Sequence, residues 1–264
     1  MLQLTNVCKT FNKNTVNEKK ALVNINLHLE EGDFVTVIGG NGAGKSTLLN
    51  LIAGVYPCDG GSIWLNQHDV TRLPEYKRAQ YLGRVFQDPM RGTAGDMNIE
   101  ENLAMAYRRG KSRTLRWGIT RGERALYREK LEVLDLGLEN RLTSKVGLLS
   151  GGQRQALTLL MATLQQPKVL LLDEHTAALD PKTAETVLNQ TNDIVMGQHL
   201  TAMMVTHNMS HAIQYGNRII MMNNGQILFD ISGAEKKHLR VEDLLARFKT
   251  AQGTALDNDR MLLS

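Results

Sequence analysis

The chain has very little cysteine and no long apolar run, and both absences narrow its class. Only Cys8 and Cys58 occur among 264 residues, which favours free thiols in a reducing compartment over a disulfide framework. No apolar run approaches the roughly 18 residues that a membrane-spanning helix needs. The first residues, MLQLTNVCKT, lack a basic segment followed by an apolar one, so we expect no secretory signal.

A strong charge of one sign is also missing. The formal net charge is only +4, from 31 basic and 27 acidic residues. This mild excess suits an anionic ligand or an acidic membrane surface and requires neither. The sequence contains no internal repeat and no low-complexity segment, and its length fits one large domain or one core with a smaller inserted subdomain.

Short apolar runs alternate with longer helical patterns, which predicts an α/β fold with a largely parallel sheet. We predict buried strands at residues 34–38, 169–173, 202–206 and 218–222. Asn224 and Gly225 predict a hairpin turn after the last of these strands. From Asp88 to Gln166 the patterns are helical and charge-rich, which predicts an inserted helical subdomain. Nearer the end, four apolar residues at helical spacing predict a stripe that packs on the core: Val241, Leu244, Leu245 and Phe248.

The stretch GGNGAGKST lies between a predicted strand and a helix that we expect from Ser46 to Ala53. Glycines let the backbone curl so that several N–H groups point at phosphate oxygens, and the helix that follows adds its positive N-terminal end. Lys45 can reach the β- and γ-phosphates, and the Ser46 hydroxyl can bind Mg²⁺. The stretch therefore predicts a phosphate-binding loop, or P-loop, made of Gly39, Gly40, Asn41, Gly42, Ala43, Gly44, Lys45, Ser46 and Thr47.

Two carboxylates follow the predicted strand at 169–173. Ligands gather at the carboxyl ends of parallel strands, so Asp173 and Glu174 are placed to act on the phosphates. Asp173 would support the Mg²⁺ shell, and Glu174, one residue later, would face the attacking water. A strand that merely ends in two solvated acids is the alternative reading.

The stretch LSGGQRQ, from Leu149 to Gln155, predicts a second anion site. Its two glycines precede a helical run and leave backbone N–H groups exposed at the helix start. We expect that helix to stop near Gln166, because the residue before Pro167 disfavours the helical conformation. One chain thus carries two phosphate-binding helix starts, although one nucleotide needs only one.

At this point the chain resembles the ATP-binding subunits of ABC transporters over roughly residues 1 to 232. LSGGQ shortly before the strand at 169–173 is highly specific to that superfamily. The resemblance assigns Gln87 to the Q-loop, Asp180 to the D-loop, His207 to the switch histidine and Phe11 to an aromatic ring that stacks on adenine. Phe11 as a simple core residue, and His207 as an ordinary polar side chain, are the alternatives.

The resemblance implies a P-loop NTPase core with a mostly parallel sheet, an antiparallel β subdomain and the inserted helical subdomain. It places the ATPase core with its β subdomain at residues 1–87 and 167–232, the helical signature subdomain at 88–166, and a C-terminal helix and tail at 233–264. It also implies ATP and Mg²⁺ as cofactors, with Ser46, Gln87 and Asp173 at the metal. ATP would lie in a head-to-tail homodimer, between the P-loop of one subunit and the residues Ser150, Gly151, Gly152 and Gln153 of the other. Lys45, Gln87, Glu174 and His207 would carry the hydrolysis.

One position departs from the family pattern. Members commonly have proline after the glutamate, whereas this chain has His175. That histidine contacts nucleotide, contacts the D-loop, or is a tolerated substitution in a turn. The departure leaves the Glu174 assignment intact and puts the rigidity of the local backbone in doubt.

The resemblance further implies a transport ATPase, peripheral on the cytoplasmic face of the membrane, coupled to separate permease chains and possibly to a solute-binding protein. Import is the leading hypothesis, because separate ATPase and permease chains resemble importers more than exporters. Residues 98–103, the arginine-rich insert after them and residues 131–138 resemble the branched-chain amino-acid uptake group, which points to amino acids as the cargo. An exporter subunit and a soluble ABC-type ATPase are the alternatives. The basic stretch from Arg108 to Lys130 either meets anionic headgroups or is a solvated helix face, and its sparse aromatic residues argue against nucleic acid.

Overall fold

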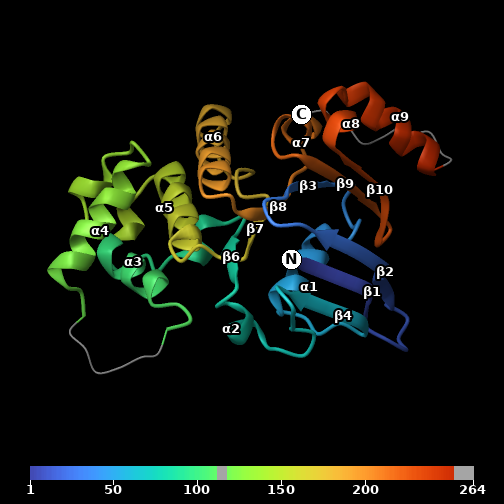
Figure 1. Cartoon of the computed structure of the whole chain (residues 1–264), viewed down its shortest axis with the longest axis horizontal. Coiled ribbons are helices and arrows are strands. Elements are labelled where there is room, and N and C mark those ends of the chain that lie inside the picture. Colours follow the sequence, from blue (N-terminus) through green and yellow to red (C-terminus); the bar gives the residue numbers. More distant parts are fainter. Residues whose placement is uncertain (112–117, 253–264) are drawn as a thin grey trace. The chain divides into compact units, whose positions relative to one another are not determined.

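The structure is a computed structural model that describes residues 1–111 and 118–252. The contacts divide the chain into two compact units, one formed by residues 1–78 and 201–264 and the other by residues 79–200. Figure 1 labels their elements along the chain. The boundaries of these units differ from the predicted domain boundaries. The predicted domains, 1–87 with 167–232, 88–166 and 233–264, stay a prediction.

The first unit contains an antiparallel sheet and four strands of a mostly parallel one. Its elements are β1 (Leu2–Phe11), β2 (Lys19–Leu29), β3 (Phe34–Ile38), α1 (Lys45–Ala53), β4 (Gly60–Leu65), β5 (His68–Asp69), α2 (Glu75–Arg78), β8 (Thr201–Val205), α7 (Met209–Gln214), β9 (Arg218–Asn223), β10 (Gln226–Ser232), α8 (Gly233–Lys237) and α9 (Val241–Gln252). The antiparallel sheet has the order β2-β1-β4-β5. Strand β3 pairs in parallel with β8 on one side and with β9 on the other, and β9 pairs antiparallel with β10.

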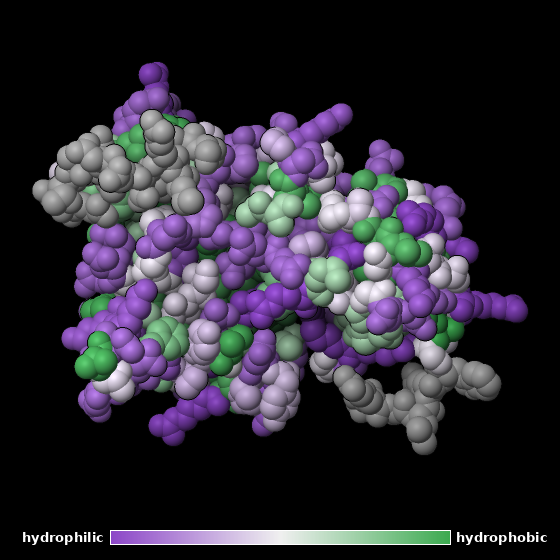
Figure 2. Space-filling model, turned by 180° about the vertical axis from the view of Figure 1, so that it is seen from behind, coloured by the Kyte–Doolittle hydropathy of each residue, from purple (hydrophilic) through white to green (hydrophobic). Residues whose placement is uncertain are grey.

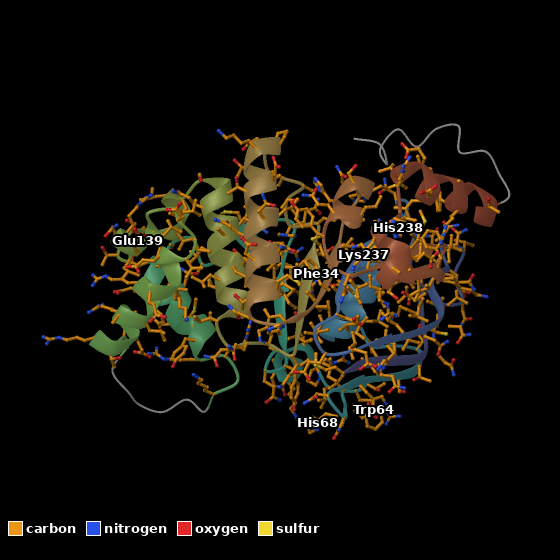
Figure 3. All side chains as sticks on the ribbon, turned by 45° about the horizontal axis from the view of Figure 1, so that its top comes forward. Phe34, Trp64, His68, Glu139, Lys237 and His238 are labelled. Carbon is orange, nitrogen blue, oxygen red and sulfur yellow. The ribbon has the colours of Figure 1, made fainter. Side chains whose placement is uncertain are left out.

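Both sheets of this unit follow from the sequence. All five residues of β3 and of β8 are buried, which is the pattern of parallel strands that are covered on both faces. The predicted hairpin at Asn224 and Gly225 is confirmed, because both residues have positive φ between β9 and β10. Figure 3 shows Trp64 and His68 at the β4–β5 end of the antiparallel sheet.

The predicted apolar stripe near the end of the chain forms part of a core. Leu244 and Phe248 are buried on α9 with Ile219, Met221 and Ile231 from the β9–β10 hairpin. The prediction that this stripe packs on the core is confirmed. The polar tail after it lies outside the described residues.

The second unit is mainly helical. Its elements are β6 (Leu82–Val85), a 3₁₀ turn (Pro89–Gly92), α3 (Ile99–Tyr107), α4 (Arg121–Glu132), two further 3₁₀ turns (Leu138–Asn140 and Val146–Leu148), α5 (Gly151–Thr163), β7 (Val169–Asp173) and α6 (Pro181–Gly197). Strands β6 and β7 pair in parallel, and α5 packs against α3, α4 and α6. Helix α5 ends at Thr163, three residues before Gln166, and Gln166 itself adopts a left-handed φ of 45°.

Both cysteines are free, as expected. Across residues 1–111 and 118–252, we find no helix with the length and hydropathy needed to cross a membrane. On the face drawn in Figure 2, apolar residues are scattered among polar ones.

Candidate functional site

The P-loop occupies the turn between β3 and α1, which confirms the strand–loop–helix context predicted for it. Gly39 and Gly44 have φ values of 151° and 103°. A Cβ on Gly39 would lie 2.2 Å from the carbonyl oxygen of Met222, and one on Gly44 would lie 2.7 Å from that of Ala21. Both positions therefore require glycine, because the backbone has a positive φ there and because a side chain would clash with a carbonyl oxygen.

Lys45 is the first residue of α1 and is buried. Its Nζ donates hydrogen bonds to the carbonyl oxygens of Gly39 at 2.7 Å and Gly40 at 3.2 Å. The ammonium group is thus held over the loop, where the N-terminal end of α1 adds positive potential, and the first turn of that helix contains no acidic residue. This arrangement fits a polyphosphate.

The far end of α1 is fixed by a buried arginine that the sequence reading missed. The Nη1 atom of Arg78 donates to the carbonyl oxygens of Leu51 at 2.7 Å and Ile52 at 2.9 Å. A cation at a helix C-terminus stabilises the helix dipole. Arg78 thereby holds the helix whose other end carries the P-loop.

Phe11 is the last residue of β1 and packs edge to face with Tyr56, with ring centroids 5.2 Å apart and an interplanar angle of 82°. Lys9 Nζ lies 5.5 Å from the Phe11 ring centroid. The adjacent Thr10 N–H donates to Asp59 at 2.6 Å. Burial would raise the pKa of Asp59, but this hydrogen bond and the nearby lysines lower it below its ordinary value. Tyr56 is therefore a second aromatic residue at this place, and its position after Gly54 gave no sequence signal.

His207 and the P-loop leave the same edge of the sheet. Strands β3 and β8 are parallel neighbours, and their carboxyl ends lead into the P-loop and, two residues beyond Val205, into His207. Phe11 belongs to the same compact unit. The first unit therefore contains the residues predicted to hold adenine and phosphates, together with the switch histidine.

Two further candidate residues lie at the carboxyl ends of neighbouring strands within the second unit. Strands β6 and β7 are parallel neighbours, so exposed Gln87 follows one strand where Asp173 ends the other. The Nη2 atom of Arg84, on β6, lies 3.8 Å from the Oδ2 atom of Asp173. Glu174 adopts a left-handed φ of 47°, a conformation that is uncommon for residues other than glycine, asparagine and aspartate.

The signature stretch begins α5 with a capping box. The Ser150 hydroxyl accepts from the Gln153 N–H at 3.3 Å, and the Gln153 side-chain oxygen accepts from the Ser150 N–H at 3.2 Å. Gly151 is exposed, so the start of this helix is open to a ligand. Gln155 donates to the carbonyl oxygen of Phe86 at 3.3 Å, which joins α5 to the segment that leads to Gln87.

Asp180 begins α6 as its N-cap, and its carboxylate accepts from the Thr183 N–H at 3.1 Å. Hydrogen bonds from Thr183 lower the pKa of Asp180 below its ordinary value. Asp180 therefore has a structural role, whatever else it contacts.

His175 is buried, and it lies between Glu174 and Asp180 along the chain. Its Nε2 atom is 3.0 Å from the Thr191 hydroxyl on α6. Burial lowers the pKa of His175 to about 4, so the ring is neutral near pH 7. The structure thus shows a contact of His175 with α6, which none of the three earlier interpretations named.

The basic insert is more structural than its composition indicates. Arg108 pairs with Glu123 at 2.9 Å, and Arg109 donates to the carbonyl oxygen of Ala162 at 2.9 Å. Burial lowers the pKa of Arg109. Exposed Lys111 lies over the ring of Tyr107, 3.7 Å from its centroid. Residues 112–117 of the insert lie outside the described part of the chain.

Comparison with known proteins agrees with these observations. The family model described as ABC transporter matches residues 22–177. The chain is 45% identical to the tyrosine transport ATP-binding protein of Clostridioides difficile over 95% of this chain and 100% of that protein. It is 32% identical to a phosphonates import ATP-binding protein of Treponema denticola, over 87% and 89% of the two chains. A dimeric ATP-binding cassette in a post-hydrolysis state bound to ADP and Pi superposes with a TM-score of 0.75 at 30% identity, over 88% of this chain and 98% of that one.

Proposed function

The chain belongs to the ABC transporter family as an ATP-binding subunit that hydrolyses ATP, and from that premise we propose that it powers amino-acid import. The proposal depends mainly on the 45% identity, along nearly the whole chain, to a tyrosine transport ATP-binding protein. Other relatives carry the names of importers of phosphonates and of spermidine or putrescine. These names support import over export, and tyrosine is the first cargo to test.

We propose that two copies form a head-to-tail pair with two composite ATP sites. Each chain has two helix starts suited to phosphate, at Lys45 on α1 and at Gly151 on α5. A pair in which the P-loop of one copy faces the signature residues of its partner uses both. A similar cassette is dimeric with ADP and Pi, which supports the pairing of two copies.

Within each composite site, the adenine would stack on Phe11 and the phosphates would bind the P-loop and Lys45. Ser46, Gln87 and Asp173 offer hydroxyl, amide and carboxylate oxygens, which are the donors that Mg²⁺ prefers. Mg²⁺ bound there would neutralise charge on the phosphates.

Hydrolysis needs an oriented water and stabilised charge rather than covalent chemistry. Glu174 would orient or deprotonate that water, and Lys45 would neutralise charge on the transferring phosphoryl group. His207 would contact the γ-phosphate and report its presence. Asp180 would contact the partner copy near the site.

The output of the pair is its closure on ATP and its opening after hydrolysis. We propose that residues 1–87 and 167–232 act as the ATPase core and that residues 88–166 pass the closure to separate permease subunits. The chain would then be peripheral on the cytoplasmic face of the membrane. A solute-binding protein would complete an importer of this kind.

The test of the proposed function is Glu174→Gln. This change keeps the shape of the side chain and removes its charge, so the variant should bind ATP and lose nearly all hydrolysis, at least 100-fold as an order of magnitude. It should also accumulate as a closed dimer with ATP and Mg²⁺, visible by size-exclusion chromatography. Wild-type turnover in this variant would remove Glu174 from the catalytic role.

Cargo is tested separately by uptake of labelled tyrosine. A strain that lacks this gene should lose uptake, the wild-type gene should restore it, and Glu174→Gln should not. Spermidine and a phosphonate serve as the comparison cargoes. Restored uptake of one of these instead of tyrosine would reassign the cargo and leave the ATPase proposal intact.

A further inference from the structure

A buried hydrogen-bond chain connects the residue after Glu174 to the middle of α6. His175 Nε2 lies 3.0 Å from the Thr191 hydroxyl oxygen, and that hydroxyl lies 2.7 Å from the carbonyl oxygen of Val187. A hydroxyl has one hydrogen to donate. Since the Val187 carbonyl can only accept, Thr191 donates to Val187 and accepts from His175. Nε2 therefore carries the ring proton.

The backbone at Glu174 needs support from outside the turn. Its φ of 47° is the left-handed conformation, which a side chain with a Cβ rarely adopts and which persists only where the surroundings impose it. Within the turn, the Ala177 N–H donates to the Glu174 carbonyl oxygen at 3.0 Å. His175 follows Glu174 directly in the chain, and only 2% of it is exposed.

We propose that His175 is a positioning residue for Glu174, acting through its hydrogen bond to Thr191. The bond ties the turn after β7 to a rigid helix and thereby fixes the direction in which the Glu174 carboxylate points. Proline, common at this place in the family, restricts the backbone through its ring. Here a side-chain hydrogen bond to α6 provides the restraint.

This inference depends on the proposed role of Glu174, and it predicts a specific kinetic pattern. Misdirecting a catalytic carboxylate lowers kcat without weakening the binding of ATP. Thr191→Val removes the acceptor while keeping the shape of the side chain. We expect kcat to fall on the order of fivefold to tenfold, as for the loss of one hydrogen bond, with KM for ATP within about twofold of wild type.

Thr163→Val is the matched control. Thr163 is also buried, and its hydroxyl also donates to the carbonyl oxygen four residues earlier, that of Leu159, at 2.9 Å. Both variants lose a hydrogen bond from the side-chain hydroxyl to a backbone carbonyl, but only Thr191→Val also loses the hydrogen bond with His175. Urea unfolding of both variants checks that they are folded to a similar extent. The Thr163→Val variant should keep the wild-type kcat.

Substitutions at position 175 provide a rescue test. The Nε2 of glutamine reaches about as far as the Nε2 of histidine, whereas the amide of asparagine corresponds to Nδ1. His175→Gln should therefore keep most of the wild-type kcat, and His175→Asn should lower kcat to the same extent as Thr191→Val. Thr191→Ser, which keeps the hydroxyl, should also stay active. Equal activity of the glutamine and asparagine variants would overturn the proposal.

A spectroscopic measurement provides evidence independent of activity. In histidine labelled with ¹⁵N, the ring of His175 should show the Nε2–H tautomer in the isolated chain, and Thr191→Val should shift its Nε2 resonance. An Nδ1–H tautomer would overturn the proposal, as would a kcat of Thr191→Val equal to that of Thr163→Val. If Glu174→Gln hydrolyses ATP normally, the assignment of Glu174 fails. If Glu174→Gln is inactive while Thr191→Val matches its control, only the positioning role fails.

Discussion

Gly152 and Thr183 approach so closely that a Cβ on the glycine would lie 2.3 Å from the Thr183 Cγ2 atom. Gly152 is in the first turn of α5, and Thr183 is in the first turn of α6. The second glycine of the signature stretch is thus required by the packing of two helices, in addition to any ligand.

This contact predicts a paired rescue. Gly152→Ala should lower the free energy of unfolding by about 1–3 kcal/mol, the usual cost of overpacking. Thr183→Ser in addition should restore most of it, because serine lacks Cγ2. Chemical denaturation measures both effects. Gly122→Ala, at a helical position with nothing within 4 Å, is the control and should be neutral or stabilising. If Thr183→Ser does not restore the free energy of unfolding, the loss in Gly152→Ala does not come from a clash with the Thr183 Cγ2 atom.

Mixed pairs test the head-to-tail arrangement. Lys45→Ala disables the P-loop half of a site, and Gly151→Asp places a carboxylate where phosphate would bind. Homodimers of either variant should trap no ATP. A mixed pair has one site with both lesions and one with neither, so it should trap one ATP, counted with radiolabelled ATP on tagged heterodimers.

The control for the mixed pairs is Gly122→Asp, which adds the same charge at an open helical position of the same unit. It should trap ATP as wild type does. If Gly151→Asp homodimers also retain normal ATP in the closed state, each chain binds its nucleotide alone, and the shared site is wrong.

Phe11 and Tyr56 are predicted to act together on the adenine. Phe11→Ala should weaken ATP binding by about 1–3 kcal/mol, the usual contribution of stacking on a base. Tyr56→Ala should cost about 0.5–1.5 kcal/mol, because the ring of Phe11 loses its edge-to-face partner. Calorimetric titration with ATP and with tripolyphosphate separates the base from the phosphates, and only ATP should be affected. Tyr76→Ala, at a tyrosine that is 74% exposed, should change neither.

The basic insert should separate into structural and surface residues. Arg109 donates to Ala162 in the last turn of α5, so Arg109→Met should destabilise the chain by about 1–2 kcal/mol. Exposed Lys111→Gln should leave stability and ATPase activity of the free chain unchanged. If the insert binds lipid, Lys111→Gln should reduce sedimentation with anionic vesicles. Unchanged sedimentation would favour the solvated-surface interpretation for this residue.

Lys236 predicts an alkaline dependence of stability. It is buried, it donates to the carbonyl oxygens of Tyr215 and Gly216, and burial lowers its pKa to about 8. The unfolded chain, with an ordinary lysine pKa near 10.4, therefore binds more protons than the folded chain between about pH 8 and 10. The contribution of Lys236 to the free energy of unfolding is therefore largest above about pH 10, and it is lost as the pH falls through about 8.

Urea denaturation of wild type and Lys236→Met at pH 7.5 and 9.5 measures this effect. Wild type should gain up to about 2 kcal/mol relative to the variant at the higher pH, at about 1.4 kcal/mol per pKa unit. A gap that does not change with pH would mean that the buried amine stays charged throughout.

Much of this protein followed from its sequence, because local patterns carry strong physical constraints. Buried strands such as 34–38 and 169–173 are short β-branched or leucine runs that end at glycine or at carboxylates. The P-loop between strand and helix needs glycine where φ is positive, so its spacing is visible in one dimension. The antiparallel subdomain came from the family resemblance, and the pairing of β1 with β2 and β4 confirms it.

Tertiary structure alone decided the partners of individual side chains. Thr191 lies 16 residues from His175, Tyr56 lies far along the chain from Phe11, and Arg109 reaches Ala162 on α5. No local periodicity encodes such pairs, because they depend on how separate elements pack. The charge of the insert was visible in the sequence. Its use was not, because a hydrogen bond to a distant carbonyl group leaves no trace in composition.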